Sequence, residues 1–174
     1  MPNWCSNNAR ISGPAPVIAE IKEILKSDDP ALLNWMVPQP KFEGDQDWYN
    51  WNVANWGSKW DISDVYVNNE SDEDDIEFSF SSAWSPPVDA FKTWAERDGR
   101  VTFELDYYEP GMGFLGTSGY DGEHFDEEVI DSNSDPEGYR AVAVDKWGEE
   151  FEEEEEPFTE WYLQGVEDIK KASE

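Results

Sequence analysis

Residues 76–81 read Ile-Glu-Phe-Ser-Phe-Ser, the clearest strand signal in the chain. Apolar and polar side chains alternate there with a period of two, which is typical of a strand with one buried face. A helix entry follows at Ser85-Pro86-Pro87, because serine caps helix starts and proline fits the first turn. The helix that starts there ends at Gly99, and its apolar face is Val88, Phe91, Trp94 and Ala95. A second alternating run at 101–107 predicts the next strand.

The pattern continues toward the N-terminus. Residues 3–12 alternate weakly, and we expect Ala9 and Ile11 to face a core. A helix follows Gly13-Pro14-Ala15-Pro16, with an apolar stripe at Val17, Ile18, Ile21, Ile24 and Leu25. Residues 64–67 predict a strand that an exposed acidic hairpin loop joins to 76–81. Residues 3–108 therefore predict an α+β fold with the ferredoxin-like order β-α-β-β-α-β.

The C-terminal third predicts additions to this core. Residues 111–131 favour an added β-hairpin, and 139–147 favour one more strand. A glutamate run then precedes Pro157, which opens a final amphipathic helix over 157–172. We therefore expect a ferredoxin-like domain with its hairpin at 1–131, and an acidic C-terminal extension with a terminal helix at 132–174.

The composition excludes several classes of protein. The chain has 174 residues, with 41 Asp+Glu against 12 Lys+Arg and a formal net charge of −29. Its 10 Trp, 9 Phe and 7 Tyr predict a folded domain, because disordered chains lack aromatic residues. The acidity argues against direct binding to nucleic acid or to an anionic membrane, and no apolar stretch approaches the length of a membrane span. One cysteine and one histidine build neither a disulfide framework nor a zinc site.

The charge is concentrated in the second part of the chain. Residues 1–69 hold 9 acids and 5 bases, a net of −4, while 70–174 hold 32 acids and 7 bases, a net of −25. Three clusters, at 70–77, 121–131 and 149–156, carry 19 of the 41 acids. A single acidic run is usually a solvated loop, but three in a small chain oppose the compact state by self-repulsion. The candidate partner-binding residues are Glu70, Asp72, Glu73, Asp74, Asp75, Asp126, Glu127, Glu128, Glu149, Glu150, Glu152, Glu153, Glu154, Glu155 and Glu156.

The Trp-rich segment 48–60 has two interpretations. Asp45 fits the N-cap and Gly57 the end of a short helix in this segment. Its rings either belong to the core or form a surface that binds a protein partner. Cys5 has no cation beside it to favour a thiolate, so we expect a small core residue.

Four motifs resemble one family. They are Met1-Pro2-Asn3-Trp4-Cys5-Ser6-Asn7, Asn55-Trp56-Gly57-Ser58-Lys59-Trp60, Ala83-Trp84-Ser85-Pro86-Pro87 and Tyr107-Tyr108-Glu109-Pro110-Gly111-Met112-Gly113-Phe114. In this order they resemble the YubB-like family, proteins of phages and conjugative plasmids with a ferredoxin-like domain. The resemblance covers about 1–130 and implies an origin in a mobile element. It implies no catalytic residues.

Two motifs match known binding loops only by their letters. Gly111-x-Gly113-x-x-Gly116 lacks the following helix that a dinucleotide site needs. Asp131-x-Asn133-x-Asp135 has Pro136 and Val142 where a calcium loop needs glycine and glutamate. We therefore expect no cofactor and no metal, and a protein that is not an enzyme.

Acidity and the implied origin favour one function. A 174-residue globule has a diameter of about 40 Å. The same length of duplex DNA carries roughly 24 negative charges, which is close to the formal net charge of −29 of this chain. The main hypothesis is a DNA mimic that inhibits a bacterial defence protein with a basic nucleic-acid-binding cleft, in the cytoplasm of the bacterial host. The alternative is an interaction module that uses the Trp-rich surface, with acidity serving solubility alone. The sequence leaves homodimer formation open.

Overall fold

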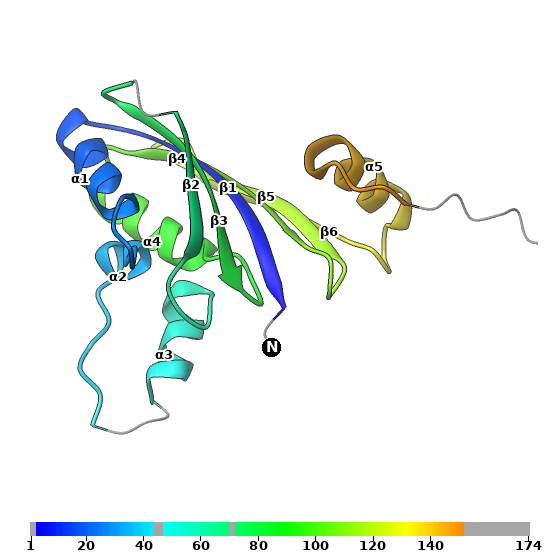
Figure 1. Cartoon of the computed structure of the whole chain (residues 1–174), viewed down its shortest axis with the longest axis horizontal. Coiled ribbons are helices and arrows are strands. Elements are labelled where there is room, and N and C mark those ends of the chain that lie inside the picture. The colour runs from blue at the N-terminus through cyan, green and yellow to red at the C-terminus, as the bar shows by residue number, and fades with distance from the viewer. Residues whose placement is uncertain (1–2, 44–46, 70–71, 152–174) are drawn as a thin grey trace, which may run out of the picture.

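The structure is a computed structural model of the whole chain, and it describes residues 3–43, 47–69 and 72–151. The first part contains β1 (Trp4–Ser12), α1 (Ala15–Leu25), α2 (Leu32–Met36), α3 (Asp47–Trp56), β2 (Ser63–Asn69) and β3 (Asp75–Ala83). The second contains α4 (Val88–Asp98), β4 (Thr102–Glu109), β5 (Phe114–Tyr120), β6 (Phe125–Asp131) and α5 (Pro136–Trp147). Figure 1 shows α1 to α4 on one face of the sheet and α5 on the other.

All neighbouring strands of the sheet are antiparallel, in the order β2-β3-β1-β4-β5-β6. The first four strands with α1 and α4 form the predicted β-α-β-β-α-β core, so the α+β ferredoxin-like fold is confirmed. The β5–β6 hairpin extends the sheet beyond β4, as residues 111–131 predict.

The core lies between the sheet and helices α1–α4. The strands bury every second side chain toward these helices, with Ala9 and Ile11 of β1 at 3% and 0% exposure. The ring of Phe91 from α4 lies between Phe80 and Phe103, with centroid distances of 6.2 and 5.4 Å. This face of the sheet is therefore closed by aromatic packing.

The prediction of a strand at 139–147 is wrong, because this segment is helix α5. Asp135 caps the helix by accepting a hydrogen bond from the N–H of Gly138 at 2.9 Å, and Pro136 occupies its first turn. The helical spacing brings Tyr139 and Ala143 together against Tyr108 and Leu115. The predicted terminal helix at 157–172 lies outside the described residues.

Candidate partner-binding face

The side of the sheet opposite α1–α4 carries a group of carboxylates, which we call the open face. Because β4 buries Phe103, Leu105 and Tyr107, it turns Glu104 and Asp106 outward. On the edge strand β6, Asp126 and Glu128 point to the same side by strand register. These four residues, Glu104, Asp106, Asp126 and Glu128, are the open-face carboxylates.

The small residues of β5 separate the two pairs of carboxylates. Gly119 pairs with Glu104 on one side and Asp126 on the other, and Thr117 pairs with Asp106 and Glu128. Same-face residues of one strand lie about 6.7 Å apart and neighbouring strands about 4.8 Å apart. Two rows of carboxylates therefore stand about 10 Å apart over a low floor.

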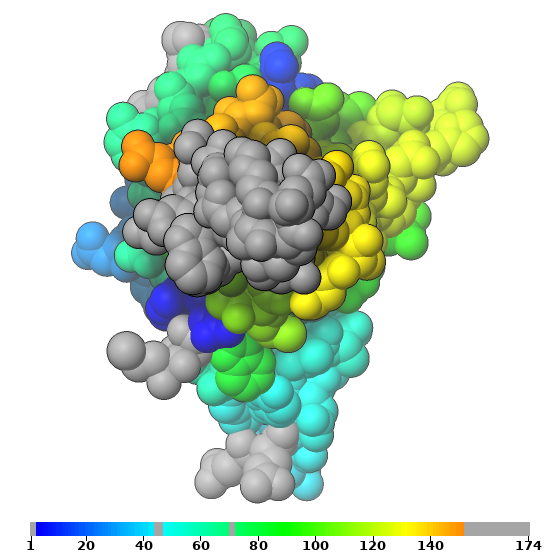
Figure 2. Space-filling model, turned by 90° about the vertical axis from the view of Figure 1, so that its right-hand side faces the viewer, coloured from blue at the N-terminus to red at the C-terminus, as the bar shows by residue number. Residues whose placement is uncertain are grey.

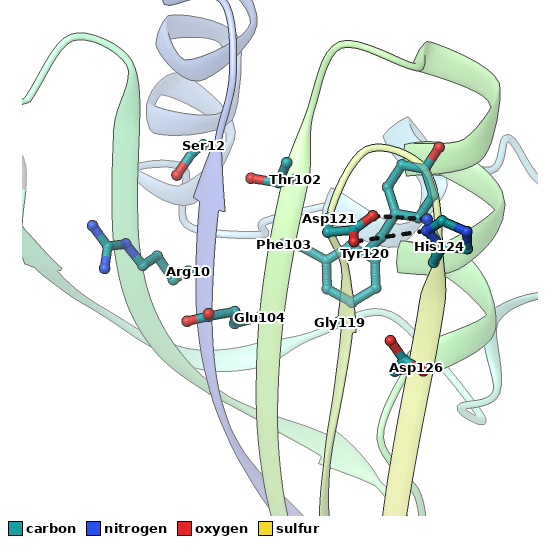
Figure 3. Close-up of a pocket in the computed structure, with 10 residues that line it drawn as sticks. All are labelled: Arg10, Ser12, Thr102, Phe103, Glu104, Gly119, Tyr120, Asp121, His124 and Asp126. Atoms are coloured by element: carbon teal, nitrogen blue, oxygen red, sulfur yellow. Dashed lines mark hydrogen bonds and ion pairs between the residues drawn. The ribbon is translucent and has the colours of Figure 1, made fainter.

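Two cavities follow this floor. The first, of about 610 Å³, is lined by all four open-face carboxylates, and the second, of about 440 Å³, shares Glu104, Gly119 and Asp126 with it. Figure 3 shows the second cavity, with Arg10 and Glu104 on neighbouring strands and His124 beside Asp121 in the β5–β6 turn. Figure 2 shows this yellow-green turn projecting from the body of the molecule. The two cavities thus form one shallow surface over β5, bordered by the carboxylates of β4 and β6.

Two cations stand at the borders of the open face. Lys146 from α5 contacts Asp106 with Nζ and Oδ1 2.8 Å apart. Arg10 from β1 contacts Asp75 at 3.0 Å and Glu77 at 3.6 Å. Both cations are half exposed, so solvent screens their charge and they only partly offset the carboxylates.

The predicted cluster at 70–77 divides into exposed and buried residues. Asp72, Glu73 and Asp74 are exposed in the β2–β3 loop, and Glu70 lies outside the described residues. The expected exposure is wrong for Asp75, which is only 8% exposed. Asp75 accepts hydrogen bonds from the Ser12 hydroxyl at 2.6 Å and from Nε of Arg10 at 3.0 Å. Asp75 therefore links β3 to β1, and little of its side chain is exposed to a partner.

The environment of Asp75 also sets its acidity. Burial acts to raise the pKa of the Asp75 carboxyl, but the hydrogen bonds from Ser12 and Arg10 and the charge of Arg10 together outweigh burial. The net effect is a pKa below the ordinary aspartate value. The carboxylate is thus ionised at neutral pH and part of the fold.

The predicted cluster at 121–131 is split by the pleat of β6. Asp126 and Glu128 lie on the open face, while Glu127 lies on the opposite side and accepts the Tyr107 hydroxyl at 2.9 Å. In the last cluster, Glu150 is exposed, and Glu149 is half-buried at the end of α5. Glu152, Glu153, Glu154, Glu155 and Glu156 lie outside the described residues.

Sequence reasoning missed Glu104 and Asp106. They belong to none of the three acidic clusters, because apolar residues separate them in β4. The signal was present in the alternation of 101–107, whose buried positions imply that Glu104 and Asp106 share the opposite face. Only the strand register shows that they lie on the same face as Asp126 and Glu128 of β6, across β5.

The Trp-rich segment contributes to both the core and the surface. Trp56 is 4% exposed and Trp51 packs against the core, while Gly57 ends α3 with φ at +79°. Trp60 is half-buried and contacts the exposed Trp4, with ring centroids 6.3 Å apart. Neither interpretation therefore holds for the whole segment.

Cys5 lies at 0% exposure in the core, which confirms the predicted core position. Burial raises the pKa of its thiol to about 12, so the thiol stays protonated at neutral pH. Within residues 3–43, 47–69 and 72–151, no group of three or more Asp, Glu, His or Cys side chains is arranged to hold a metal ion. Across the same residues, every helix is too short or too polar to cross a membrane.

Comparison with known proteins gives a family and a structural likeness. Residues 59–163 match the family model described as the ferredoxin-like domain in Api92-like protein. A solved structure similar to this one is the crystal structure of protein api92 from Yersinia pseudotuberculosis, with a TM-score of 0.49 and 16% sequence identity. The alignment covers 59% of this chain and 40% of that protein, so this chain spans well under half of its length. None of the curated proteins matches the sequence.

Proposed function

This chain belongs to the family of the ferredoxin-like domain in Api92-like protein, and we propose that it is a DNA mimic that inhibits a bacterial nucleic-acid-binding defence protein. It acts by binding and not by catalysis. The open-face carboxylates occupy the partner's basic cleft in place of phosphates, assisted by Asp72, Glu73 and Asp74 and by Glu150.

One observation carries the proposal: four carboxylates stand in two rows on the face of the sheet that α1–α4 leave uncovered, beside α5. A regular antiparallel sheet fixes their spacing, so the charges are preorganised and bind with little loss of conformational freedom. A basic cleft that attracts phosphates is expected to attract such a surface by the same electrostatic steering. The formal net charge of −29 adds long-range attraction.

The four-motif resemblance to YubB-like proteins supports the biological setting. A phage or conjugative plasmid that enters a cell meets restriction, CRISPR and related nucleases, which bind nucleic acid through basic surfaces. We therefore place this protein in the cytoplasm of the bacterial host, where it protects the incoming element.

The first test identifies the partner and then measures competition. Proteins retained from a bacterial lysate are identified by mass spectrometry, and the DNA affinity of a nucleic-acid-binding candidate is titrated with this protein. We expect the apparent dissociation constant of the candidate for DNA to rise linearly with the free concentration of this protein, as simple competition requires. A ternary complex in which DNA affinity is undiminished would reject mimicry.

A matched pair of variants assigns the effect to the open face. The test variant is Glu104→Gln, Asp106→Asn, Asp126→Asn and Glu128→Gln, and the control is Glu20→Gln, Glu96→Gln, Asp28→Asn and Asp29→Asn, which neutralises exposed carboxylates elsewhere. Both lose four charges. We expect the test variant alone to slow association, by roughly tenfold or more at low salt. Equal slowing in both variants would mean that net charge acts without a defined site.

The Trp-rich surface module remains the second candidate. Its supporting observation is the partly exposed group of Trp4, Trp60 and Trp84 around Lys59, whose Nζ lies 4.5 and 4.8 Å from the Trp60 and Trp84 ring centroids. Exposed aromatic rings are frequent anchors of protein interfaces. Partner binding that barely changes between low and high salt, and that duplex DNA does not compete, would favour this module.

A further inference from the structure

An apolar groove runs along the helix-covered side of the molecule, away from the open face. Two adjoining cavities of about 470 and 380 Å³ form it, and they share Ser85 and Phe114. Trp84 and Met112 line one end, and Asp89, Glu127 and Val129 line the other. The groove therefore lies between the start of α4 and the β5–β6 hairpin.

Hydrogen bonds fix the walls of this groove. The N–H of Trp84 donates to the Asn3 carbonyl at 2.9 Å, and the Ser85 hydroxyl donates to the Gly57 carbonyl. The buried Glu109 carboxylate accepts from the N–H groups of Gly111 and Met112, at 3.0 and 2.6 Å. The four motifs quoted in the sequence analysis thus meet at this place.

The groove has an exposed apolar side chain at each end. Met112 is 60% exposed and Val129 is 55% exposed, one at each end. Trp84 adopts a left-handed backbone with φ at +71°, which is costly for a bulky residue. A positive-φ aromatic residue beside exposed apolar side chains in one groove motivates a binding hypothesis for this place.

The charges around the groove indicate the kind of segment that fits it. Asp89 and Glu127 are exposed carboxylates that line the same cavity. The bond from Tyr107 holds Oε1 of Glu127. Lys59 stands at the opposite end, where its Nζ lies over the rings of Trp60 and Trp84. A segment with apolar side chains for the Trp84–Met112 end and a cation for the Asp89–Glu127 end matches this pattern.

We propose that this groove binds a basic segment of the partner protein that also carries apolar side chains. Its apolar side chains pack on Trp84, Met112 and Phe114, and a lysine or arginine pairs with Glu127 and Asp89. The inference rests on the proposed function in one respect, because it takes the partner to be basic. The groove adds an apolar anchor that charge on the open face lacks.

The test uses two designed peptides and methionine methyl NMR. One peptide is a 14-residue amphipathic Leu/Lys helix, and the other is a Ser/Lys peptide of equal charge. The Met112 methyl group reports the groove, and the Met36 methyl group, at 0% exposure in the core, is the internal control. We expect the Leu/Lys peptide to shift Met112 and leave Met36 unchanged, and the Ser/Lys peptide to shift neither.

Variants complete the test. The Met112→Ser and Val129→Ser substitutions remove exposed apolar groups and should weaken binding of the Leu/Lys peptide about fivefold or more. The open-face test variant should bind this peptide almost as well as the wild type. Equal affinity for the two peptides, no binding of either, or an unmoved Met112 at saturation would overturn the groove. A Met112 shift with undiminished partner–DNA affinity would reject the mimicry proposal alone.

Discussion

The two faces of the sheet differ sharply in the side chains that they carry. The helix-covered face of β3 and β4 holds Phe80 and Phe103 around Phe91, while the opposite face of β4 holds Glu104 and Asp106. Phe103, Glu104 and Asp106 all come from β4, and the period-two pleat places them on opposite faces. The comparison teaches how this fold accommodates its acidity. Carboxylates and core side chains alternate along β4, so the carboxylates remain hydrated on the exposed face.

The largest effect is expected on the helix-covered face. Phe91→Ala removes the central ring of the aromatic stack at 0% exposure, and it should lower the free energy of unfolding by about 3–5 kcal/mol. Chemical denaturation followed by tryptophan fluorescence measures the change. The matched change Lys92→Ala on the same helix should cost under about 1 kcal/mol. Equal losses in the two variants would mean that the packing of this face is not decisive.

A smaller effect is expected at Asp75, the acid that joins the two strands. Asp75→Asn should cost about 1–2 kcal/mol at pH 7, because a charge-assisted hydrogen bond to Arg10 is lost. The pKa of Asp75 is lowered in the folded state. Its stabilisation is therefore present above the unfolded value near 3.9 and is lost as pH falls through the folded pKa.

The measurement for Asp75 is urea unfolding of wild type and variant between pH 7 and pH 2. The difference in the free energy of unfolding should shrink as the pH falls below about 4. Asp74→Asn, one residue earlier and exposed, is the control and should show little difference at any pH. A difference at Asp75 that is constant with pH would contradict the assigned role of its charge.

The smallest effect on stability is expected on the open face. The four open-face substitutions proposed above should leave the free energy of unfolding within about 0.5 kcal/mol of wild type, or raise it slightly by relieving repulsion. Loss of the exposed Lys146–Asp106 pair costs little in such a setting. Thermal unfolding at low and high salt measures this. A loss above about 2 kcal/mol would show that these acids are structural and not available to a partner.

The sequence predicted the core of the fold because its signals were local. The alternation of 76–81 and the entry at Ser85-Pro86-Pro87 correspond to β3 and α4 in the structure. The strand predicted at 139–147 was wrong. Tyr139, Ala143 and Trp147 recur every four residues, which is the spacing of one face of a helix. There the Asp135–Pro136 start signal was the better guide.

The candidate site was predicted only in part, because it depends on contacts between distant strands. Counting acids along the chain picked out Asp126 and Glu128 of the open face together with Asp75, which accepts hydrogen bonds from Arg10 and Ser12 of β1. It missed Glu104 and Asp106, which no local cluster marks. The four quoted motifs contain the residues of the groove at Trp84 and Met112, but only the fold shows that segments near residues 3, 57, 84 and 112 meet.

The buried thiol of Cys5 gives the protein a built-in reporter of its own opening. It is the single cysteine of the chain, and it stands on β1, between β3 and β4 in the sheet. Burial raises the pKa of this thiol to about 12, so the buried thiol stays protonated at the pH of ordinary thiol labelling. A thiol reagent therefore reacts chiefly with molecules in which β1 has separated from its neighbours. The labelling rate of the unmodified protein therefore measures how often β1 opens at the end that carries Cys5. For the same reason, a dye would label a cysteine added at the surface and not Cys5.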